Sequence, residues 1–578
     1  MTVRGPVNET ASFEPFASGA RLRCIAEPAS GAVRGVVLLL PPFAEEMNKS
    51  RRMCALLARG LAADGWRVVR IDLLGCGDSA GSLRDASWEQ WCDDLRTELH
   101  RHLDGSPTLW LWGVRAGALF ARDLLAALPT ANLLLWQPVL SGQTHLNQFL
   151  RLHAAAALRG THKAGEPSPA QSLAAGEVVE VAGYELPPAV ARGLQSAVFD
   201  VPANFRGQIA WLEVSMSQGA QPSAASRPAI DRLRSAGHLV SFEHVPGAPF
   251  WQSVEIEQNE ELLARSRGLV ESLSGDGRDA PSPSAAPARA VADTPDGDRI
   301  LRIVFEGIDL VAVLSAPRAV PSGIGVVVIV GGPQYRVGSH RQFVELARAL
   351  AHVGHYVLRY DCRGMGDSDG AMQGFEASVP DVGAAIDALL KAAPEVRQVV
   401  LWGLCDAASI ALMCAARQPA LKGLVLANPW VRETASLATA TVKQYYRARL
   451  LQVEFWRKLL SGRFDWVSSL RSLSANLSAM FSSPAAGTAE PCNFRISMAR
   501  GLSRFHGPIL LLLSGDDLTA REFIEYTSKA PEWDGLLKAD RVRTVHLPKA
   551  DHTFSRRAWK ARVEQETISW IDGRLRVQ

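Results

Sequence analysis

The chain has 578 residues, which is too many for one hydrophobic core and predicts two or more domains. Its net charge is only +3, with 47% hydrophobic and 21% charged residues, as is ordinary for globular proteins. This charge excludes the basic field of a nucleic-acid-binding protein and any strong attraction to anionic membranes.

Residues 1–16 lack the basic and apolar segments of a signal peptide. The longest apolar runs, 35–40 and 324–330, are far shorter than the ~20 residues of a membrane-spanning helix. The eight cysteines include no C-x-x-C pair, which favours reduced thiols over disulfides or a metal site. We therefore expect a cytoplasmic protein without a transmembrane segment, metal or cofactor.

In chain order, short runs rich in β-branched residues alternate with longer helical patterns. The first of these runs are 35–40, 67–72, 108–112 and 132–136. Near-continuous apolar strands separated by amphipathic helices indicate a parallel sheet that helices cover on both faces. The turns after these strands then lie at the carboxyl edge of the sheet, where such folds bind ligands.

At 109–117 the chain reads LWLWGVRAG, a strand-like run that enters a tight turn between two glycines. This is the turn that carries the nucleophile in α/β-hydrolases. The residue there is Arg115, whose guanidinium stays charged and cannot act as a nucleophile. Two roles remain open for it: an ion pair with Glu45 or Glu46, or a bidentate contact with an anionic group of a ligand. A helical cap is expected at about 142–205.

Residues 274–298 are dominated by Pro, Ala, Ser, Gly and Asp, which is typical of a flexible linker. They separate a domain at 1–273 from a domain at 299–578. Segments on the two sides echo each other in the same order at an offset near 290, which indicates a duplication. The matched segments are 50–81 with 339–370, 109–117 with 399–407, 133–139 with 424–430, and 244–251 with 546–554.

In the second copy a cysteine occupies the tight turn. The predicted strands there are 325–330, 356–361, 398–402 and 423–427. The stretch LWGLCDAAS places Cys405 between the small residues Gly403 and Ala407, which let the backbones approach. A thiol at a helix N-terminus has a lowered pKa and serves as a nucleophile. We therefore predict that Cys405 is a nucleophile and not merely a small buried residue.

A cysteine nucleophile needs a base, and the base needs a carboxylate that orients it. His552 follows the strand-like run 542–547 and is the predicted base, while His546 inside the run is expected to be a packed or edge residue. The preceding apolar strand ends in Asp516 and Asp517. We prefer Asp517 as the acid, with Asp516 as second choice, because strand alternation leaves Asp516 facing outward. The order nucleophile, acid, histidine is that of α/β-hydrolases.

The neighbouring loops supply further expectations. Thr519 and Glu522 form a T-x-x-E pattern that predicts a capping box at the next helix. The oxyanion site should combine the amide of Asp406 with the amide of Gly332 or of Gln334, in the loop after the first strand of this copy. An aromatic and basic insertion at about 432–498 is expected to form a helical lid over the thiol, or a helix pair packed elsewhere. Its basic residues favour a phosphate-bearing substrate, such as a pantetheine thioester.

The first copy lacks all three catalytic residue types at the matching positions. Arg115 stands where the second copy has Cys405, and residues 249–250 stand where it has His552. The segment 211–221, which matches the strand end that bears the acid, contains no Asp. We predict that this half is catalytically inactive and serves as a docking or scaffold domain.

Longer strings resemble a known pair of families. PPFAEEMNKSRRM, DLLGCGDS and LWLWGVRAGAL resemble the exosortase A system-associated hydrolase 2 proteins, and VGGPQYRVGSHRQF, YDCRGMGDS, LWGLCDAAS and SGDDLTAREF resemble the exosortase A system-associated hydrolase 1 proteins. The chain therefore looks like a fusion of the two. This resemblance implies two tandem α/β-hydrolase domains, each a mostly parallel sheet flanked by helices with a helical cap insertion. It also implies a place in bacterial exopolysaccharide production, beside acyl ligases and carrier proteins.

Two functions remain open from the sequence. The first is an esterase, thioesterase or acyltransferase that uses Cys405, His552 and Asp517. Its substrate would be an acyl ester or thioester, carried by CoA or a carrier protein, with water, a hydroxyl or an amine as acceptor. The second is a non-catalytic binding or scaffold protein, which the inactive first copy and the carboxylate of Asp406 beside the thiol both favour. In either case we expect the two halves to pack together; the oligomeric state stays open.

Overall fold

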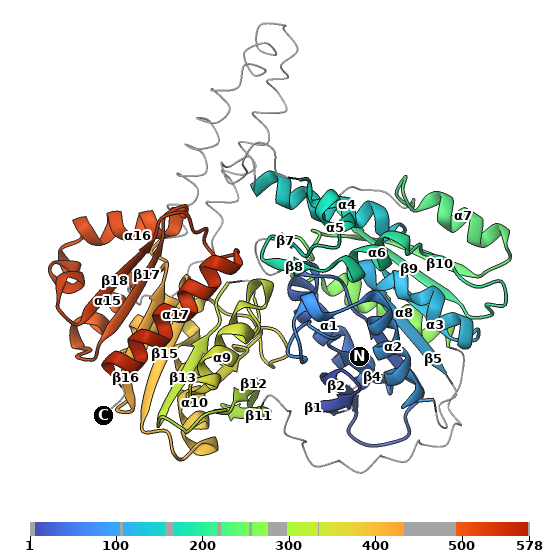
Figure 1. Ribbon diagram of the computed structural model, residues 1–578. Helices are drawn as coiled ribbons and strands as arrows, with labels where there is room; N and C mark the ends of the chain where they lie inside the picture. Colours follow the sequence, from blue (N-terminus) through green and yellow to red (C-terminus); the bar gives the residue numbers. More distant parts are fainter. Residues whose placement is uncertain are drawn as a thin grey trace, which may run out of the picture.

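The computed structural model of the protein describes residues 6–103, 108–156, 167–216, 221–253, 257–274, 297–332, 334–432 and 493–575. The predicted linker and the predicted second cap lie for the most part outside these residues. Figure 1 shows the described residues as two lobes, one from each half of the chain.

Strands and helices alternate through both halves. The strands of the first half are β1 (Val7–Phe16), β2 (Gly19–Pro28), β3 (Val36–Leu40), β4 (Arg67–Ile71), β5 (Leu109–Val114), β6 (Asn132–Trp136), β7 (Val179–Val181), β8 (Tyr184–Leu186), β9 (Ile209–Ser215) and β10 (Val240–Pro246). Its helices are α1 (Glu45–Ala63), α2 (Trp88–His100), α3 (Ala121–Ala127), α4 (Gly142–Ala156), α5 (Pro169–Ala174), α6 (Pro188–Ser196), α7 (Arg227–Ser235) and α8 (Glu260–Leu273).

The second half repeats this plan. Its strands are β11 (Asp298–Phe305), β12 (Ile308–Ser315), β13 (Ile324–Ile329), β14 (Tyr356–Tyr360), β15 (Gln398–Leu404), β16 (Leu421–Ala427), β17 (Ile509–Ser514) and β18 (Val542–Leu547). Its helices are α9 (Gln342–His352), α10 (Val379–Ala392), α11 (Asp406–Cys414), α15 (Phe494–Arg504), α16 (Leu518–Lys529) and α17 (Arg557–Arg574).

The two main sheets have the same strand order. The first is β1-β2-β4-β3-β5-β6-β9-β10 and the second is β11-β12-β14-β13-β15-β16-β17-β18. In the first sheet the pairs β1–β2 and β2–β4 are antiparallel, as are their counterparts β11–β12 and β12–β14 in the second, and all remaining pairs of the two sheets are parallel. Each half therefore has the α/β-hydrolase fold, and the predicted tandem α/β architecture is confirmed. The eight predicted strands are all present, as β3 to β6 and β13 to β16.

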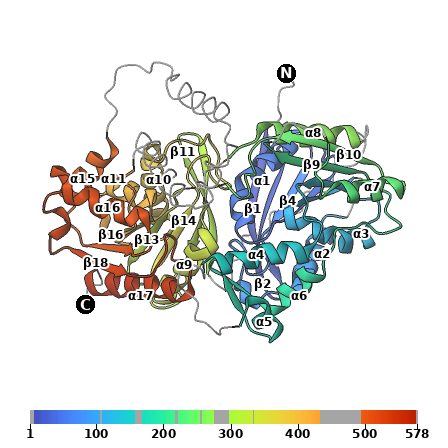
Figure 2. The same cartoon turned by 90° about the horizontal axis from the view of Figure 1, so that it is seen from above.

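Helices bury both faces of each sheet. In the first half α1 and α8 cover one face, and α2, α3, α6 and α7 cover the other. In the second half α9 and α17 cover one face, and α10, α11, α15 and α16 cover the other. Figure 2 shows helices on both sides of the sheets, and this double burial explains why the central strands are apolar throughout. Among the described residues, no helix is both long and apolar enough to cross a membrane.

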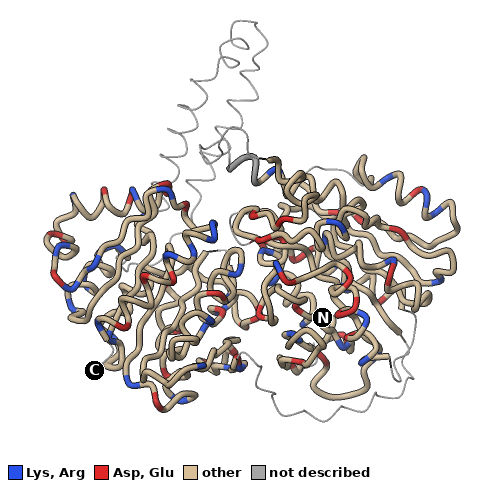
Figure 3. Tube along the Cα trace, viewed as in Figure 1, with Lys and Arg blue, Asp and Glu red and all other residues tan. Residues whose placement is uncertain are grey.

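Buried ion pairs join the two halves, and they repeat reciprocally. Arg70 on β4 donates to Asp367 at 2.6 Å, and Arg359 on β14 donates to Asp78 at 2.6 Å. The two pairs are related by the same offset of 289 positions, from 70 to 359 and from 78 to 367. All four residues are at most 4% exposed. The contacts between the halves therefore repeat with the pattern of a two-fold axis. Elsewhere, acidic and basic residues are interspersed over both halves (Figure 3).

Candidate active site

Cys405 sits at a strained turn between β15 and α11. Its backbone has φ 63° and ψ −125°, a conformation that costs a non-glycine residue about 1–3 kcal/mol. The turn is tight, because a Cβ at Gly403 would lie 2.5 Å from the carbonyl carbon of Ala407. The backbone N–H of Cys405 donates to the carbonyl of Ala427 at 2.9 Å, which ties the turn to the end of β16. The thiol is half-buried at the carboxyl edge of the sheet, where β15 ends.

His552 and Asp517 lie in hydrogen-bonding contact. The distance from His552 Nδ1 to Asp517 Oδ2 is 2.9 Å. Asp517 is buried, and its oxygens also accept the backbone N–H groups of Thr519 and Ala520, each at 3.1 Å. Burial opposes the charge of Asp517, but the hydrogen bond and charge of His552, together with these amides, hold its pKa below the usual value. Asp516, the second choice, is exposed.

The helix that follows begins two residues earlier than the capping-box pattern suggests. Asp517, not Thr519, is the N-cap of α16. Glu522 pairs instead with Arg432, at 2.6 Å between Oε2 and Nη2. The predicted T-x-x-E capping box is therefore wrong, because the carboxylate before Thr519 takes the free amides first. Asp517 thus caps α16 and contacts the imidazole of His552 at the same time, and the cap fixes its carboxylate in place.

Asn428, at the end of β16, connects the two loops of the site. Its Nδ2 donates to the carbonyl of His552 at 3.0 Å and to Ser514 Oγ at 2.9 Å. The sequence patterns above predict no role for Asn428. A signal was available, since Gln137 occupies the same place after β6 and its Oε1 accepts the N–H of Val214 at 2.8 Å. An amide side chain thus bridges neighbouring strand ends in both halves.

The expected oxyanion site already holds a carboxylate. Asp406 Oδ2 accepts the backbone N–H of Gly332, and Oδ1 accepts that of Ala407, both at 2.9 Å. The side chain of Gln334 bonds to Ser339 instead. Burial raises the pKa of Asp406. The amide of Gly332, an expected donor to a substrate, is therefore engaged by the residue next to the nucleophile.

The environment of the thiol disfavours its ionisation. Burial, followed by the charge of Asp406, raises the pKa of Cys405 well above the ordinary thiol value. The expected lowering by the helix N-terminus is outweighed. Within the described part of the chain, no hydrogen bond joins Cys405 Sγ to His552, although both lie at the carboxyl edge of the same sheet. The structure thus brings base and acid together and leaves thiol and base unbonded.

The first half has the same tight turn, with the charged side chain of Arg115 in place of a thiol. Arg115 has φ 52° and donates to Glu46 Oε1 through Nε at 3.1 Å and through Nη2 at 3.0 Å. Its Nη1 donates to the carbonyl of Gln137 at 3.1 Å, and its guanidinium lies 5.0 Å from the ring centroid of Trp251. Of the two roles left open for Arg115, the structure favours the internal ion pair. Phe250, at the position matching the histidine, is 2% exposed and packs in the core.

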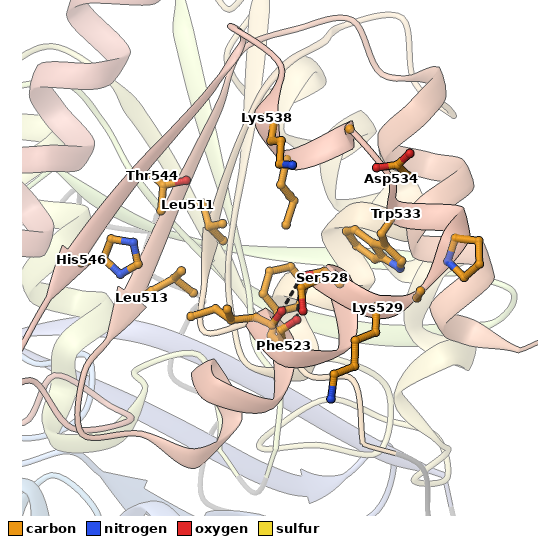
Figure 4. Close-up of a pocket in the computed structure, with 16 residues that line it drawn as sticks. Leu511, Leu513, Phe523, Ser528, Lys529, Trp533, Asp534, Lys538, Thr544 and His546 are labelled. Carbon is orange, nitrogen blue, oxygen red and sulfur yellow. Dashed lines mark hydrogen bonds between the residues drawn. The ribbon is translucent and has the colours of Figure 1, made fainter.

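A separate cavity of about 540 Å³ lies on the α16 side of β17 and β18. Figure 4 shows His546 and Thr544 on one strand, with Trp533 opposite. None of the predicted catalytic residues lines it. His546 is exposed, in agreement with its expected role as an edge residue rather than the base.

The C-terminal half matches a known protein family. Residues 323–522 match the Hydrolase_4 family, described as serine aminopeptidase, S33. The match includes Cys405 and Asp517 and ends before His552. It supports a hydrolase-type activity for this half. No curated protein sequence matches the chain.

Several solved structures are similar to about half of the chain. An esterase from Pyrococcus furiosus is 15% identical, with a TM-score of 0.35, over 48% of this chain and 91% of its own. Est1E from Butyrivibrio proteoclasticus, solved with ferulic acid, is 16% identical, with a TM-score of 0.31, over 48% and 99%. A dienelactone hydrolase from Anabaena variabilis is 16% identical, with a TM-score of 0.31, over 48% and 98%.

Proposed function

We propose that the C-terminal half is an acyl-transfer enzyme, an esterase, thioesterase or acyltransferase, with Cys405 as nucleophile, His552 as base and Asp517 as the orienting acid. The observation that carries the proposal is the 2.9 Å contact between His552 Nδ1 and Asp517 Oδ2, on a loop tied to the edge where the strained Cys405 turn lies. Because Asp517 engages Nδ1, Nε2 is the nitrogen left to accept a proton.

The reaction would proceed in two steps. His552 Nε2 takes the proton of the thiol while Sγ attacks the carbonyl carbon of an ester or thioester. The bond to the leaving group breaks, and the imidazolium returns the proton to the leaving alkoxide or thiolate. A thioester between the acyl group and Cys405 remains. Water, a hydroxyl or an amine then attacks its carbonyl carbon while His552 Nε2 takes the acceptor's proton; the bond between that carbon and Sγ breaks, and the imidazolium returns the proton to the Cys405 thiolate. Within the described residues the thiol and the imidazole are not hydrogen-bonded to each other, so their side chains must rotate toward each other before the proton can pass.

Asp406 favours the alternative, a non-catalytic binding protein. Its carboxylate occupies the amide of Gly332 and raises the pKa of the thiol. The carbonyl oxygen of an acyl substrate can accept the Gly332 N–H only after Asp406 has released it. Asp406 releases this N–H when the substrate displaces its side chain or when its carboxylate is protonated. The two functions therefore differ in whether Asp406 ever leaves the site.

We further propose that the N-terminal half is a pseudo-enzyme that works as one unit with the C-terminal half. The half-buried Arg115–Glu46 pair and the reciprocal ion pairs between the halves support this. The resemblance of the sequence strings to exosortase A system-associated hydrolases supports a role in cytoplasmic steps of exopolysaccharide production, with CoA-linked or carrier-linked thioesters as substrates.

Trapping of the acyl group tests the proposal. The protein is incubated with acyl-CoA of several chain lengths and with p-nitrophenyl esters, and its intact mass is measured. We expect one acyl adduct on the wild type and none on Cys405→Ala. Cys76→Ala, which removes another half-buried thiol, should keep the adduct. If no chain length forms an adduct and Cys405→Ala hydrolyses the esters as fast as the wild type, the binding-protein alternative holds.

A further inference from the structure

A hairpin of the N-terminal half reaches the segment that carries His552. Strands β7 and β8 pair antiparallel and are joined by Ala182 and Gly183, with φ of 48° and 87°. The hairpin belongs to the insertion between β6 and β9. Figure 1 shows it on the side of its lobe that faces the C-terminal half. Its contacts with that half are polar and specific.

The hairpin caps helix α17, which starts five residues after His552. Glu180 Oε1 accepts the backbone N–H of Arg557, the first residue of the helix, at 2.6 Å. The helix's own N-cap residue, Arg556, makes no side-chain cap bond. A carboxylate at a helix N-terminus satisfies a free amide and interacts favourably with the helix dipole. Lys560 Nζ adds a second link by donating to the carbonyl of Gly183 at 3.2 Å.

A second line of contact runs through His340. This residue is 4% exposed, and a Cβ at Gly183 would lie 2.4 Å from its Cγ, so only glycine lets the hairpin turn pack against the imidazole. The ring of Tyr184 meets it edge-on, with centroids 6.4 Å apart. On the other side, His340 Nε2 lies 3.4 Å from Oγ1 of Thr553, the residue next to His552. Burial, with the charge of Lys560 adding to it, lowers the pKa of His340 to about 3, so the ring is neutral.

We propose that the β7–β8 hairpin is a positioning element for His552. Glu180 fixes the start of α17, five residues after His552, by accepting the N–H of Arg557. The Gly183 turn packs against His340, which in turn contacts Thr553, the residue next to His552. The base thus depends on both halves: Asp517 orients its ring from the C-terminal half, and the hairpin fixes its loop from the N-terminal half. This inference rests on the proposed function, and it gives the N-terminal half, which lacks a nucleophile, a part in positioning the base.

Alkylation of Cys405 by iodoacetamide reports on this geometry without a substrate. Its rate is followed by peptide mass spectrometry at neutral pH in the full-length chain. If His552 accepts the thiol proton, His552→Ala slows alkylation. Glu180→Ala should then slow it toward the rate of His552→Ala, by about tenfold, because a displaced base loses its proton-transfer geometry. With p-nitrophenyl acetate, kcat should fall by a similar factor while KM changes less than about twofold.

Three matched variants separate positioning from general damage. Glu185→Ala removes the other hairpin carboxylate, which pairs with the side chains of Arg557 and Arg84 and not with the backbone N–H that Glu180 accepts, and should leave both rates unchanged. Glu180→Gln keeps an acceptor for the Arg557 amide and should restore most of the rate. Thr553→Val breaks the His340 contact at constant shape and should lower the rate as Glu180→Ala does. If Glu180→Ala does not fold, the alkylation rate of Thr553→Val tests the positioning role in its place.

The outcomes distinguish this inference from the proposed function. If His552→Ala alkylates at the wild-type rate, the proposed function fails and the hairpin has no base to position. If His552→Ala is slow while Glu180→Ala and Thr553→Val match the wild type, the function stands and the positioning role is refuted. If Glu185→Ala is as slow as Glu180→Ala, the effect is a general loss of hairpin structure and the specific role is likewise refuted.

Discussion

Arg115 and Cys405 occupy the same turn in their halves and share a positive φ, yet only one of them can act as a nucleophile. The turn persists because of packing. A Cβ at Gly117 would lie 1.9 Å from the carbonyl oxygen of Leu40, so the chain can pass here only as a tight corner. In the C-terminal half this turn carries the thiol of Cys405. In the N-terminal half it places the guanidinium of Arg115 beside the carboxylate of Glu46, the carbonyl of Gln137 and the indole of Trp251. Backbone strain at such a corner therefore marks the fold, and the side chain decides the chemistry.

Replacement of Asp406 should make the thiol more reactive. In Asp406→Ala the charge beside Cys405 is gone, and the amides of Gly332 and Ala407 become free to stabilise negative charge. The pKa of the thiol should fall, and alkylation by iodoacetamide at pH 7.5 should accelerate about tenfold for each unit of that fall. The measurement is the alkylation rate of Cys405 followed by peptide mass.

The neighbouring exposed carboxylate supplies the control. Asp516→Ala removes a charge from the same edge of the sheet without a contact to the thiol, and the rate should stay at the wild-type value. If Asp406→Ala is no faster than the wild type, burial alone sets the thiol pKa. The carboxylate would then be no obstacle to the chemistry.

At the scale of single residues, the sequence predicts where a residue lies in the fold better than the direction of its side chain. Chain order and strand ends suffice to bring His552 beside Asp517, because parallel strands deliver their carboxyl ends to one edge. The direction of the Asp406 side chain could not be predicted. It depends on how closely the loop at Gly332 approaches the first turn of α11, and that distance is a property of the packed structure.

At the scale of elements, the buried strands were predictable, as was the edge strand β18, which matches the strand-like run 542–547, whereas the antiparallel outer strands β1, β2, β11 and β12 were not. The strands β3 to β6 are nearly continuous apolar runs, whereas β1 reads VNETASFEPF, with polar residues on its solvent side. An edge strand of this kind gives only a weak alternating signal. The start of α16 was misplaced for a related reason: Asp517 and Thr519 are both good N-caps, and the contact of Asp517 with both amides decides between them.

Helix α17 contains a carboxylate that should make the protein less stable at high pH. Burial, with the charge of Glu345 adding to it, raises the pKa of Glu564 to about 7. The folded state thus holds a proton that the unfolded chain releases near pH 4.5. The penalty is absent below the unfolded pKa and complete above about pH 7. Glu564→Gln should therefore stabilise the protein by about 1–3 kcal/mol at pH 8 and leave it unchanged at pH 4.5.

Thermal unfolding at the two pH values checks this prediction. A gain of a few degrees in Tm at pH 8 is expected, at about 2–4 °C per kcal/mol for a domain of this size. An equal gain at both pH values would mean that the amide simply packs better. A loss at pH 8 would mean that the ionised carboxylate is stabilised by Lys560.

At the scale of the whole molecule, the two halves are held by charges that neither half neutralises alone. Asp367 accepts hydrogen bonds from Arg51 and Arg70 of the N-terminal half and from Arg336 of its own half, at 2.6 to 3.0 Å. Burial opposes its charge, but these guanidinium groups hold the pKa of Asp367 well below the ordinary value. A buried carboxylate that serves three arginines cannot be lost without leaving uncompensated charge.

The last prediction concerns that carboxylate. A protease site placed within residues 275–296 would allow the chain to be cut between its halves after folding. The cut protein should elute from size exclusion as one species, because the reciprocal ion pairs remain. Asp367→Ala should weaken this association by about 3–5 kcal/mol, since it leaves buried guanidinium groups unpaired, and the halves should separate on dilution. Asp369→Ala removes a carboxylate that is 41% exposed and pairs with Arg59, and should have little effect. Halves that part in the unmodified protein would show that the linker, and not this network, keeps them together.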